Sequence, residues 1–153
     1  MGLILLTFLY FLPLSNERFI IESSNIAFYS YAPLEDIQAV NTEAIGAIDM
    51  ETREFLIKIP VSAFEFPNKL MQKHFNDSYL ETDLYPECIF KGKIKGESAI
   101  GELTLHGKTN EINIPIDFLE DGEKIKIPKI LFKNIAEDIE IKVSSTFKKY
   151  IKE

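Results

Sequence analysis

Two histidines and one cysteine are the residues of this chain best suited to metal binding or nucleophilic catalysis. They are His74, His106 and Cys88. A zinc site needs three or four His, Cys or carboxylate ligands, usually with some of them closely spaced. These three residues are scattered, so we predict no metal site. The pattern favours His74 at the rim of the domain and His106 in a turn beside Gly107.

A nucleophilic pair of Cys88 with a histidine would need an exposed thiolate held beside an imidazole. Cys88 alternates in phase with Phe90, which predicts that its thiol is buried. No glycine-rich phosphate loop is visible, and we predict neither a cofactor nor a catalytic residue. An enzyme that uses His74 and His106 on a hydrophobic substrate is an alternative, and it requires both imidazoles to meet at one mouth of the fold.

The remaining chemical feature is an apolar face that is rich in Phe and Ile. A few polar groups, His74, Asn76, Tyr79 and Tyr85, lie in or near one short predicted helix. An apolar pocket with a small polar mouth suits an amphiphile with a long tail. A solid, fully packed core is the other interpretation, and the residue pattern alone favours it.

Short β-strands must position these residues. Hydrophobic and polar residues alternate in stretches that begin at Ile26, Phe55, Leu103, Ile112 and Ile139. One buried face and one wet face are typical of antiparallel sheets. Seven or eight such strands predict an all-β barrel or sandwich, and periodicity does not choose between the two.

Turn and helix signals separate the strands. Hairpin turns are predicted at 49–52, 96–98 and 121–122. A helix is predicted over 68–76, because apolar residues recur there at helical spacing and Pro67 suits a first turn. Three prolines should mark edges, bulges or strand ends, because they cannot donate ladder hydrogen bonds. These are Pro60, Pro115 and Pro128.

The composition indicates one acidic globular domain. The chain has 153 residues and a formal net charge of -7. Recognition of nucleic acid needs a basic stripe on the protein, and this chain has none, so a nucleic-acid partner is excluded. Docking on an anionic membrane surface is also disfavoured, because the chain itself is acidic.

The amino terminus is an apolar run over 3–12, followed by Pro13. It is too short to span a bilayer, which needs about 20 residues, but it has the length of a signal-peptide core. The start Met-Gly lacks the usual basic residue, and a buried first strand is the alternative. We predict a signal peptide at 1–16, a β-barrel domain at 17–153, no integral membrane span, and a periplasmic or secreted protein.

Several motifs in combination resemble a known family. The stretch Leu70 to Thr82 resembles a helix-and-loop motif of YceI-like proteins of the Bacteroidota type. Tyr85 to Gly92 resembles the family's Tyr-Pro strand, and Gly101 to Thr109 its Gly-x-Leu-Thr-x-His-Gly-x-Thr strand and turn. Further matches to the family occur at 32–39, 126–130 and 134–143.

The resemblance implies an antiparallel, lipocalin-like barrel of about eight strands with one short helix. It implies an exported binding protein, without catalytic residues, for a polyisoprenoid, a quinone or a fatty-acid-like tail. His74, Asn76 and Tyr79 are the candidates for contact with a polar headgroup. The ligand-binding candidates as a set are Leu70, Met71, His74, Phe75, Asn76, Tyr79, Phe90, Leu103 and Leu105.

The chain departs from the family between Gly107 and Ile127, where it is short by a hairpin arm of about 15 residues. The barrel is then expected to be open or narrowed, or to be completed by a second chain. An open edge exposes unpaired backbone groups and favours a homodimer. The alternative function is therefore a structural or interaction protein with a filled core and a strand-edge dimer.

Overall fold

The computed structural model describes residues 17–30, 36–117, 119–132 and 139–151. The predicted signal peptide at 1–16 lies outside these residues. So do residues 32–35 of the family-like stretch at 32–39 and the segment 133–138 near the end of the chain.

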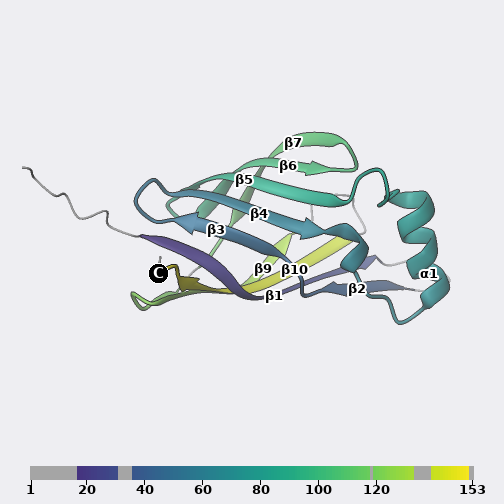
Figure 1. Cartoon of the computed structure of the whole chain (residues 1–153), viewed down its shortest axis with the longest axis horizontal. Helices are drawn as coiled ribbons and strands as arrows, with labels where there is room; N and C mark the ends of the chain where they lie inside the picture. Colours follow the sequence, from purple (N-terminus) through teal and green to yellow (C-terminus); the bar gives the residue numbers. More distant parts are fainter. Residues whose placement is uncertain (1–16, 31–35, 118, 133–138, 152–153) are drawn as a thin grey trace, which may run out of the picture.

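Antiparallel strands and one short α-helix make up the described chain, which confirms the predicted all-β class (Figure 1). The strands form one sheet. Their bounds are β1 Arg18–Ser30, β2 Ile37–Asn41, β3 Ile45–Asp49, β4 Glu54–Pro60, β5 Glu87–Lys95, β6 Ser98–Leu105, β7 Lys108–Pro115, β8 Leu119–Glu120, β9 Lys124–Phe132 and β10 Ile139–Lys149. The helical segments are η1 Val61–Ala63, α1 Lys69–His74 and η2 Phe75–Tyr79.

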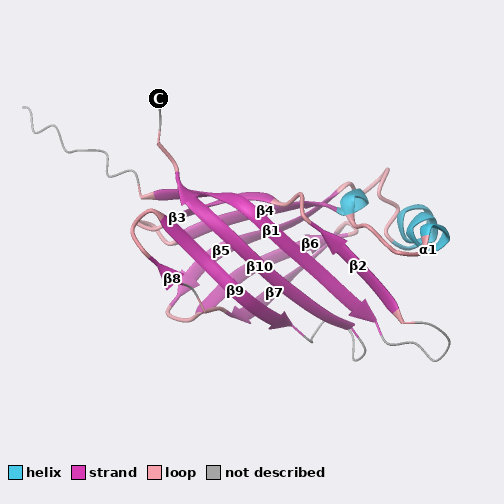
Figure 2. Ribbon diagram, turned by 90° about the horizontal axis from the view of Figure 1, so that it is seen from below, coloured by secondary structure: helices cyan, strands magenta, loops and turns pink. Residues whose placement is uncertain are grey.

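The strand order is β7-β6-β5-β4-β3-β1-β10-β9-β8, and β2 pairs with the second half of β1. Figure 2 shows the strands running obliquely across the curled sheet, with α1 beside one of its ends. β1 is therefore central: β10 pairs along one of its sides, and β3 and β2 share the other.

The sheet is not closed into a complete barrel. β7 and β9 approach each other, but no backbone pairing joins β7 to β8 or β9 in the described residues. β8 has only two residues, Leu119–Glu120. It lies in the segment between Gly107 and Ile127, which the sequence predicted to be short by a hairpin arm. The predicted incomplete closure is confirmed.

Two inward-facing glycines allow the sheet to curl sharply. Gly92 on β5 and Gly101 on β6 are direct partners. A Cβ atom on Gly92 would lie 2.0 Å from the carbonyl oxygen of Ile100, and one on Gly101 would lie 2.0 Å from that of Lys91. The two backbones therefore meet where no side chain fits, as at the corner of a barrel. Phe55 on β4 lies opposite Gly92.

Two bulges also shape the central strands. One shifts the register of β1 against β10 between Ile21 and Ser23. In the other, β9 carries two residues, 128 and 129, opposite the single residue Ser144 of β10. The predicted role of Pro128 as an edge, bulge or strand-end residue is confirmed. Bulges bend a strand and raise its twist.

The three predicted hairpin turns are confirmed. They join β3 to β4, β5 to β6, and β8 to β9. Pro60 ends β4 and Pro115 ends β7, as expected for residues that cannot donate to the ladder.

The predicted helix over 68–76 is observed as α1, and its end differs from the prediction. The Asn68 side chain caps it, with Oδ1 accepting hydrogen bonds from the backbone N–H of Leu70 at 3.0 Å and of Met71 at 3.1 Å. Pro67 precedes this cap and is not in the first turn. The chain continues beyond His74 as the wider π-helical turn η2.

Candidate functional site

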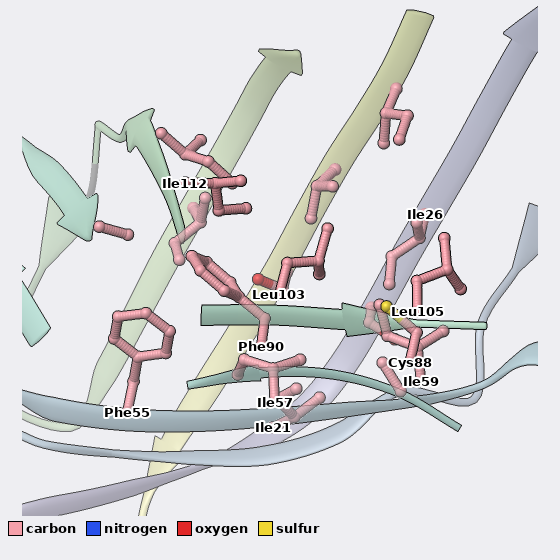
Figure 3. A pocket seen from close by; sticks show the side chains of 18 of the residues that line it. Ile21, Ile26, Phe55, Ile57, Ile59, Cys88, Phe90, Leu103, Leu105 and Ile112 are labelled. Atoms are coloured by element: carbon pink, nitrogen blue, oxygen red, sulfur yellow. The ribbon is translucent and has the colours of Figure 1, made fainter. Parts of the chain in front are cut away.

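The candidate site is an apolar cavity of about 380 Å³ enclosed by the curled sheet (Figure 3). This volume lies within the roughly 300–1,000 Å³ of typical ligand pockets. The interior is thus not the solid core that the residue pattern alone favoured. Its walls are Ile21, Ser24, Ile26 and Phe28 on β1; Ala44 and Ile48 on or next to β3; Phe55, Ile57 and Ile59 on β4; Val61 and Phe64 in or next to η1; Phe75 and Leu80 in or next to η2; Cys88, Phe90 and Ile94 on β5; Ala99, Leu103 and Leu105 on β6; Ile112, Ile114 and Ile116 on or next to β7; Ile127 on β9; and Ile141, Val143, Ser145 and Phe147 on β10.

Period-two alternation explains why these side chains face inward. On β4, Phe55, Ile57 and Ile59 line the cavity, while Leu56 and Lys58 alternate with them. Figure 3 shows Phe55 and Ile57 on one side of the space, and Ile26 of β1 and Ile112 of β7 on the other. Opposite walls of the sheet therefore contribute to one continuous apolar surface.

Four aromatic rings cluster at the end of the cavity where α1 lies. The Phe28 ring stacks on Phe75 with ring centroids 5.6 Å apart, and it meets Phe64 edge-on at 5.3 Å. Phe66 lies 4.8 Å from Phe75 and 5.7 Å from Phe28. We call Phe28, Phe64, Phe66 and Phe75 the aromatic cap. Rings from β1, from the η1 region and from η2 thus hold the short helical segment against the sheet.

A second buried cluster lies toward the opposite end and contains Phe19, Phe55, Ile125 and Phe147. Phe55 also packs on Phe90, with ring centroids 4.7 Å apart. The cavity therefore lies between two well-packed apolar clusters, and its long walls are the strands between them.

Three lining residues carry a heteroatom in the side chain: Ser24, Ser145 and Cys88. Burial raises the pKa of the Cys88 thiol to about 11, so the thiol is neutral at physiological pH. A neutral, buried thiol is a poor nucleophile. This agrees with the predicted buried orientation of Cys88.

The structure brings four of the nine predicted ligand-binding residues together. Phe75, Phe90, Leu103 and Leu105 line the cavity. Met71 packs against the buried cluster next to the aromatic cap without lining the cavity.

The other four predicted residues lie outside the cavity wall. Leu70 and Tyr79 are 64% and 72% exposed, and His74 is exposed on α1. Asn76 is partly buried, and its Oδ1 atom is buried without a hydrogen-bond partner. The headgroup roles given to His74, Asn76 and Tyr79 therefore stay predictions.

His106 lies in the turn between β6 and β7, as the sequence predicted. Its Nε2 atom lies 2.7 Å from Oε2 of Glu81, and its ring meets Tyr85 edge-on with centroids 4.8 Å apart. His106 and Glu81 both have positive φ angles, 50° and 46°, which are uncommon without glycine. The pair fixes the segment after η2 to this turn. His74, in contrast, is exposed on α1.

The family assignment follows from the sequence as a whole. A sequence model of the YceI-like domain matches residues 22–148. The chain belongs to the YceI-like domain family. The matched span runs from within β1 through most of β10 and so includes all the cavity walls except Ile21. A search of curated proteins finds no match.

Solved structures share this fold. A polyisoprenoid-binding domain from Saccharophagus degradans is 12% identical, with a TM-score of 0.70 over 88% of this chain and 99% of that one. Burkholderia cenocepacia BcnA is 14% identical, with a TM-score of 0.62 over 81% and 94%. The Campylobacter jejuni YceI protein is 16% identical, with a TM-score of 0.51 over 72% and 81%.

Sequence reasoning missed most of the wall formed by the central strands. Ile21 and Ser24 of β1 and Val143 and Ser145 of β10 line the cavity but were not among the ligand-binding candidates. The alternation at 139–143 was the available signal for β10, because it already separated the inward residues. Residues 18–25 do not alternate, since the bulge in β1 shifts the phase.

Within the residues that the structure describes, no helix has both the length and the apolar character to cross a membrane. In the same residues, no three His, Cys, Asp or Glu side chains gather to hold a metal ion.

Proposed function

We propose that this YceI-like protein is an exported binding protein that holds the tail of an amphiphilic lipid in its cavity. The tail is a polyisoprenoid, a quinone side chain or a fatty-acid-like chain. The observation that carries this proposal is the 380 Å³ cavity, whose walls are almost entirely aliphatic and aromatic. A related fold from Saccharophagus degradans is described as polyisoprenoid-binding, which supports the same ligand class.

The apolar walls supply the binding free energy. Burial of one CH₂ group contributes about 0.8 kcal/mol, so ten such groups contribute about 8 kcal/mol. This corresponds to about a micromolar Kd before the entropy cost of association is subtracted. A tail that fills more of the cavity therefore binds well without polar contacts.

The helix end offers polar groups for a headgroup. Asn76 has a buried Oδ1 atom without a partner, and its neighbours Phe75 and Leu80 line the cavity. A carbonyl oxygen in this position accepts a hydrogen bond from a ligand hydroxyl or amine. His74 and Tyr79 lie exposed on the same segment, where a headgroup can meet them and still contact water.

Native mass spectrometry tests the proposal. The protein, purified from a bacterial host, should carry a lipid whose mass is lost on extraction with organic solvent. The variant Leu103→Trp places a large side chain in the cavity and should abolish this lipid. The control Glu102→Trp adds the same bulk to the exposed neighbouring position of β6. Wild-type protein that carries no lipid and binds no long-chain fluorescent probe would disprove the proposed function.

Export is the second part of the proposal. The apolar run at 3–12 supports a signal peptide, and YceI-like proteins are generally periplasmic. Cell fractionation with mass measurement of the mature protein tests this. Cleavage near residue 16 is expected, and an intact amino terminus in the cytoplasmic fraction would contradict export.

A strand-edge homodimer is the alternative that the open sheet supports. β7 and β8 are the terminal strands of the described sheet, and unpaired strand edges favour association. The native mass spectrum reports this directly, because a dimer doubles the mass of the intact complex.

A further inference from the structure

Two serine residues interrupt the apolar lining of the cavity next to each other. Ser24 on β1 and Ser145 on β10 are direct cross-strand partners, and both line the cavity. Cβ atoms of such partners lie about 4.5–5.5 Å apart, so one ligand atom can reach both hydroxyls.

The backbone places this pair inside the cavity and not at its rim. Along β10, Val143 and Phe147 flank Ser145 on the inward face; along β1, Ile26 lies two residues after Ser24. The bulge after Ile21 shifts the phase of β1 so that Ser24 faces inward. The pair lies between the aromatic cap and the cluster around Phe147.

The Ser24 hydroxyl has no partner of its own. Its Oγ atom is buried and makes no hydrogen bond, whereas most buried polar side-chain atoms in folded proteins are bonded. Leaving such a group buried and unpaired lowers the stability of the fold. Alanine would fill the same space without this cost, so stability does not explain a serine here. Because Ser24 lines the cavity, rotation about its Cα–Cβ bond can turn the hydroxyl toward the space.

We propose that Ser24 and Ser145 form a hydrogen-bonding site for a carbonyl oxygen carried by the ligand. This rests on the proposed function and narrows its ligand class. The site selects a lipid with an oxygen inside the cavity, such as a prenylated quinone, over a pure hydrocarbon. Each serine O–H donates to the carbonyl oxygen, and the tail occupies the aliphatic walls on either side.

The experiment compares two ligands and four proteins. The probes are a short-tailed menaquinone, which has two ring carbonyls, and squalene, which has an isoprenoid chain and no oxygen. The proteins are the wild type, Ser24→Ala, the double variant Ser24→Ala/Ser145→Ala, and the control Ser23→Ala. Ser23 is exposed and next to Ser24, so the control makes the same substitution away from the cavity.

Affinities are measured by competition against a long-chain fluorescent probe. We expect Ser24→Ala to bind menaquinone about fivefold more weakly, and the double variant about tenfold or more. Squalene affinity should be unchanged in all four proteins. The infrared carbonyl band of bound menaquinone should lie at lower frequency in the wild type than in the double variant, because a hydrogen bond weakens the C=O bond.

Two results would overturn the proposal, and they are distinguishable. If the wild type binds both probes but menaquinone affinity and its carbonyl band do not change in the variants, the serine site is wrong and lipid binding stands. If the wild type binds neither probe, lipid binding itself fails, and the serine site with it. Thermal unfolding of each apo variant checks that it folds, and Ser24→Ala should be at least as stable as the wild type.

Discussion

Removal of the Phe75 ring is the perturbation that most directly tests the aromatic cap. Phe75 contacts three other rings, Phe28, Phe64 and Phe66, at centroid distances between 4.8 and 6.0 Å. A Phe→Ala change in a core costs about 3–5 kcal/mol. Phe75 is only partly buried, so we expect the lower end of this range, about 3 kcal/mol.

The measurements are urea unfolding and thermal unfolding, both followed by circular dichroism, together with the release rate of a bound long-chain probe. A loss of about 3 kcal/mol lowers the Tm of a domain of this size by about 10 °C. Because Phe75 lines the cavity, Phe75→Ala should also release the probe faster.

Tyr79→Ala is the matched control, since it removes an aromatic ring from the same segment η2. Tyr79 is 72% exposed, and exposed substitutions usually change stability by less than about 0.5 kcal/mol. Equal losses in the two variants would refute the cap as the element that holds η2 on the sheet.

Three further predictions concern substitutions of Cys88, Gly101 and Asn41. The neutral Cys88 thiol stabilises the fold below the ordinary thiol pKa of 9.0, and this contribution is lost as pH rises toward the folded pKa of about 11. Between these pH values the wild-type protein should therefore lose about 2 kcal/mol more of its unfolding free energy than Cys88→Ala. Gly101→Ala should prevent folding or cost several kcal/mol, because its Cβ would lie 2.0 Å from the Lys91 carbonyl oxygen; a Tm within a few degrees of wild type would contradict the close approach. Asn41→Ala should cost about 2–3 kcal/mol in urea unfolding, because the fully buried Asn41 donates to the Pro60 carbonyl at 2.8 Å; an unchanged midpoint would show that water replaces the amide.

Local sequence patterns predicted the strands, turns and inward faces well. Cys88, Phe90, Leu103 and Leu105 follow strict alternation, and all four line the cavity. Period-two alternation determines which face is buried, so it transfers directly into the three-dimensional structure.

The helix residues were harder to place from sequence. Helical spacing put Leu70, Met71, His74 and Phe75 on one side, but the structure buries part of this side and leaves Leu70 and His74 exposed. A helix of six residues makes its contacts mainly through the segment that follows it. Periodicity contains no information about where that segment docks.

The cavity itself was not predictable from local pattern. Whether inward side chains fill a barrel or leave space depends on its curvature and on which strands face each other. Here these depend on the close approach of Gly92 and Gly101 and on the pairing of β1 with β10. The resemblance to YceI-like proteins implied an interior that holds a ligand, whereas the alternation alone favoured a packed core.

The pairing of β1 with β10 also has a consequence for the order of folding. Ile26 pairs with Val143, so the centre of the sheet joins strands from opposite ends of the domain. Such non-local contacts are slow to form, because the entropy of closing a long loop must be overcome first. A chain still emerging from a ribosome or a translocation pore cannot make this contact until residues 139–149 are available. The domain should therefore stay open, and able to pass through a pore as an extended chain, until synthesis of β10 is complete.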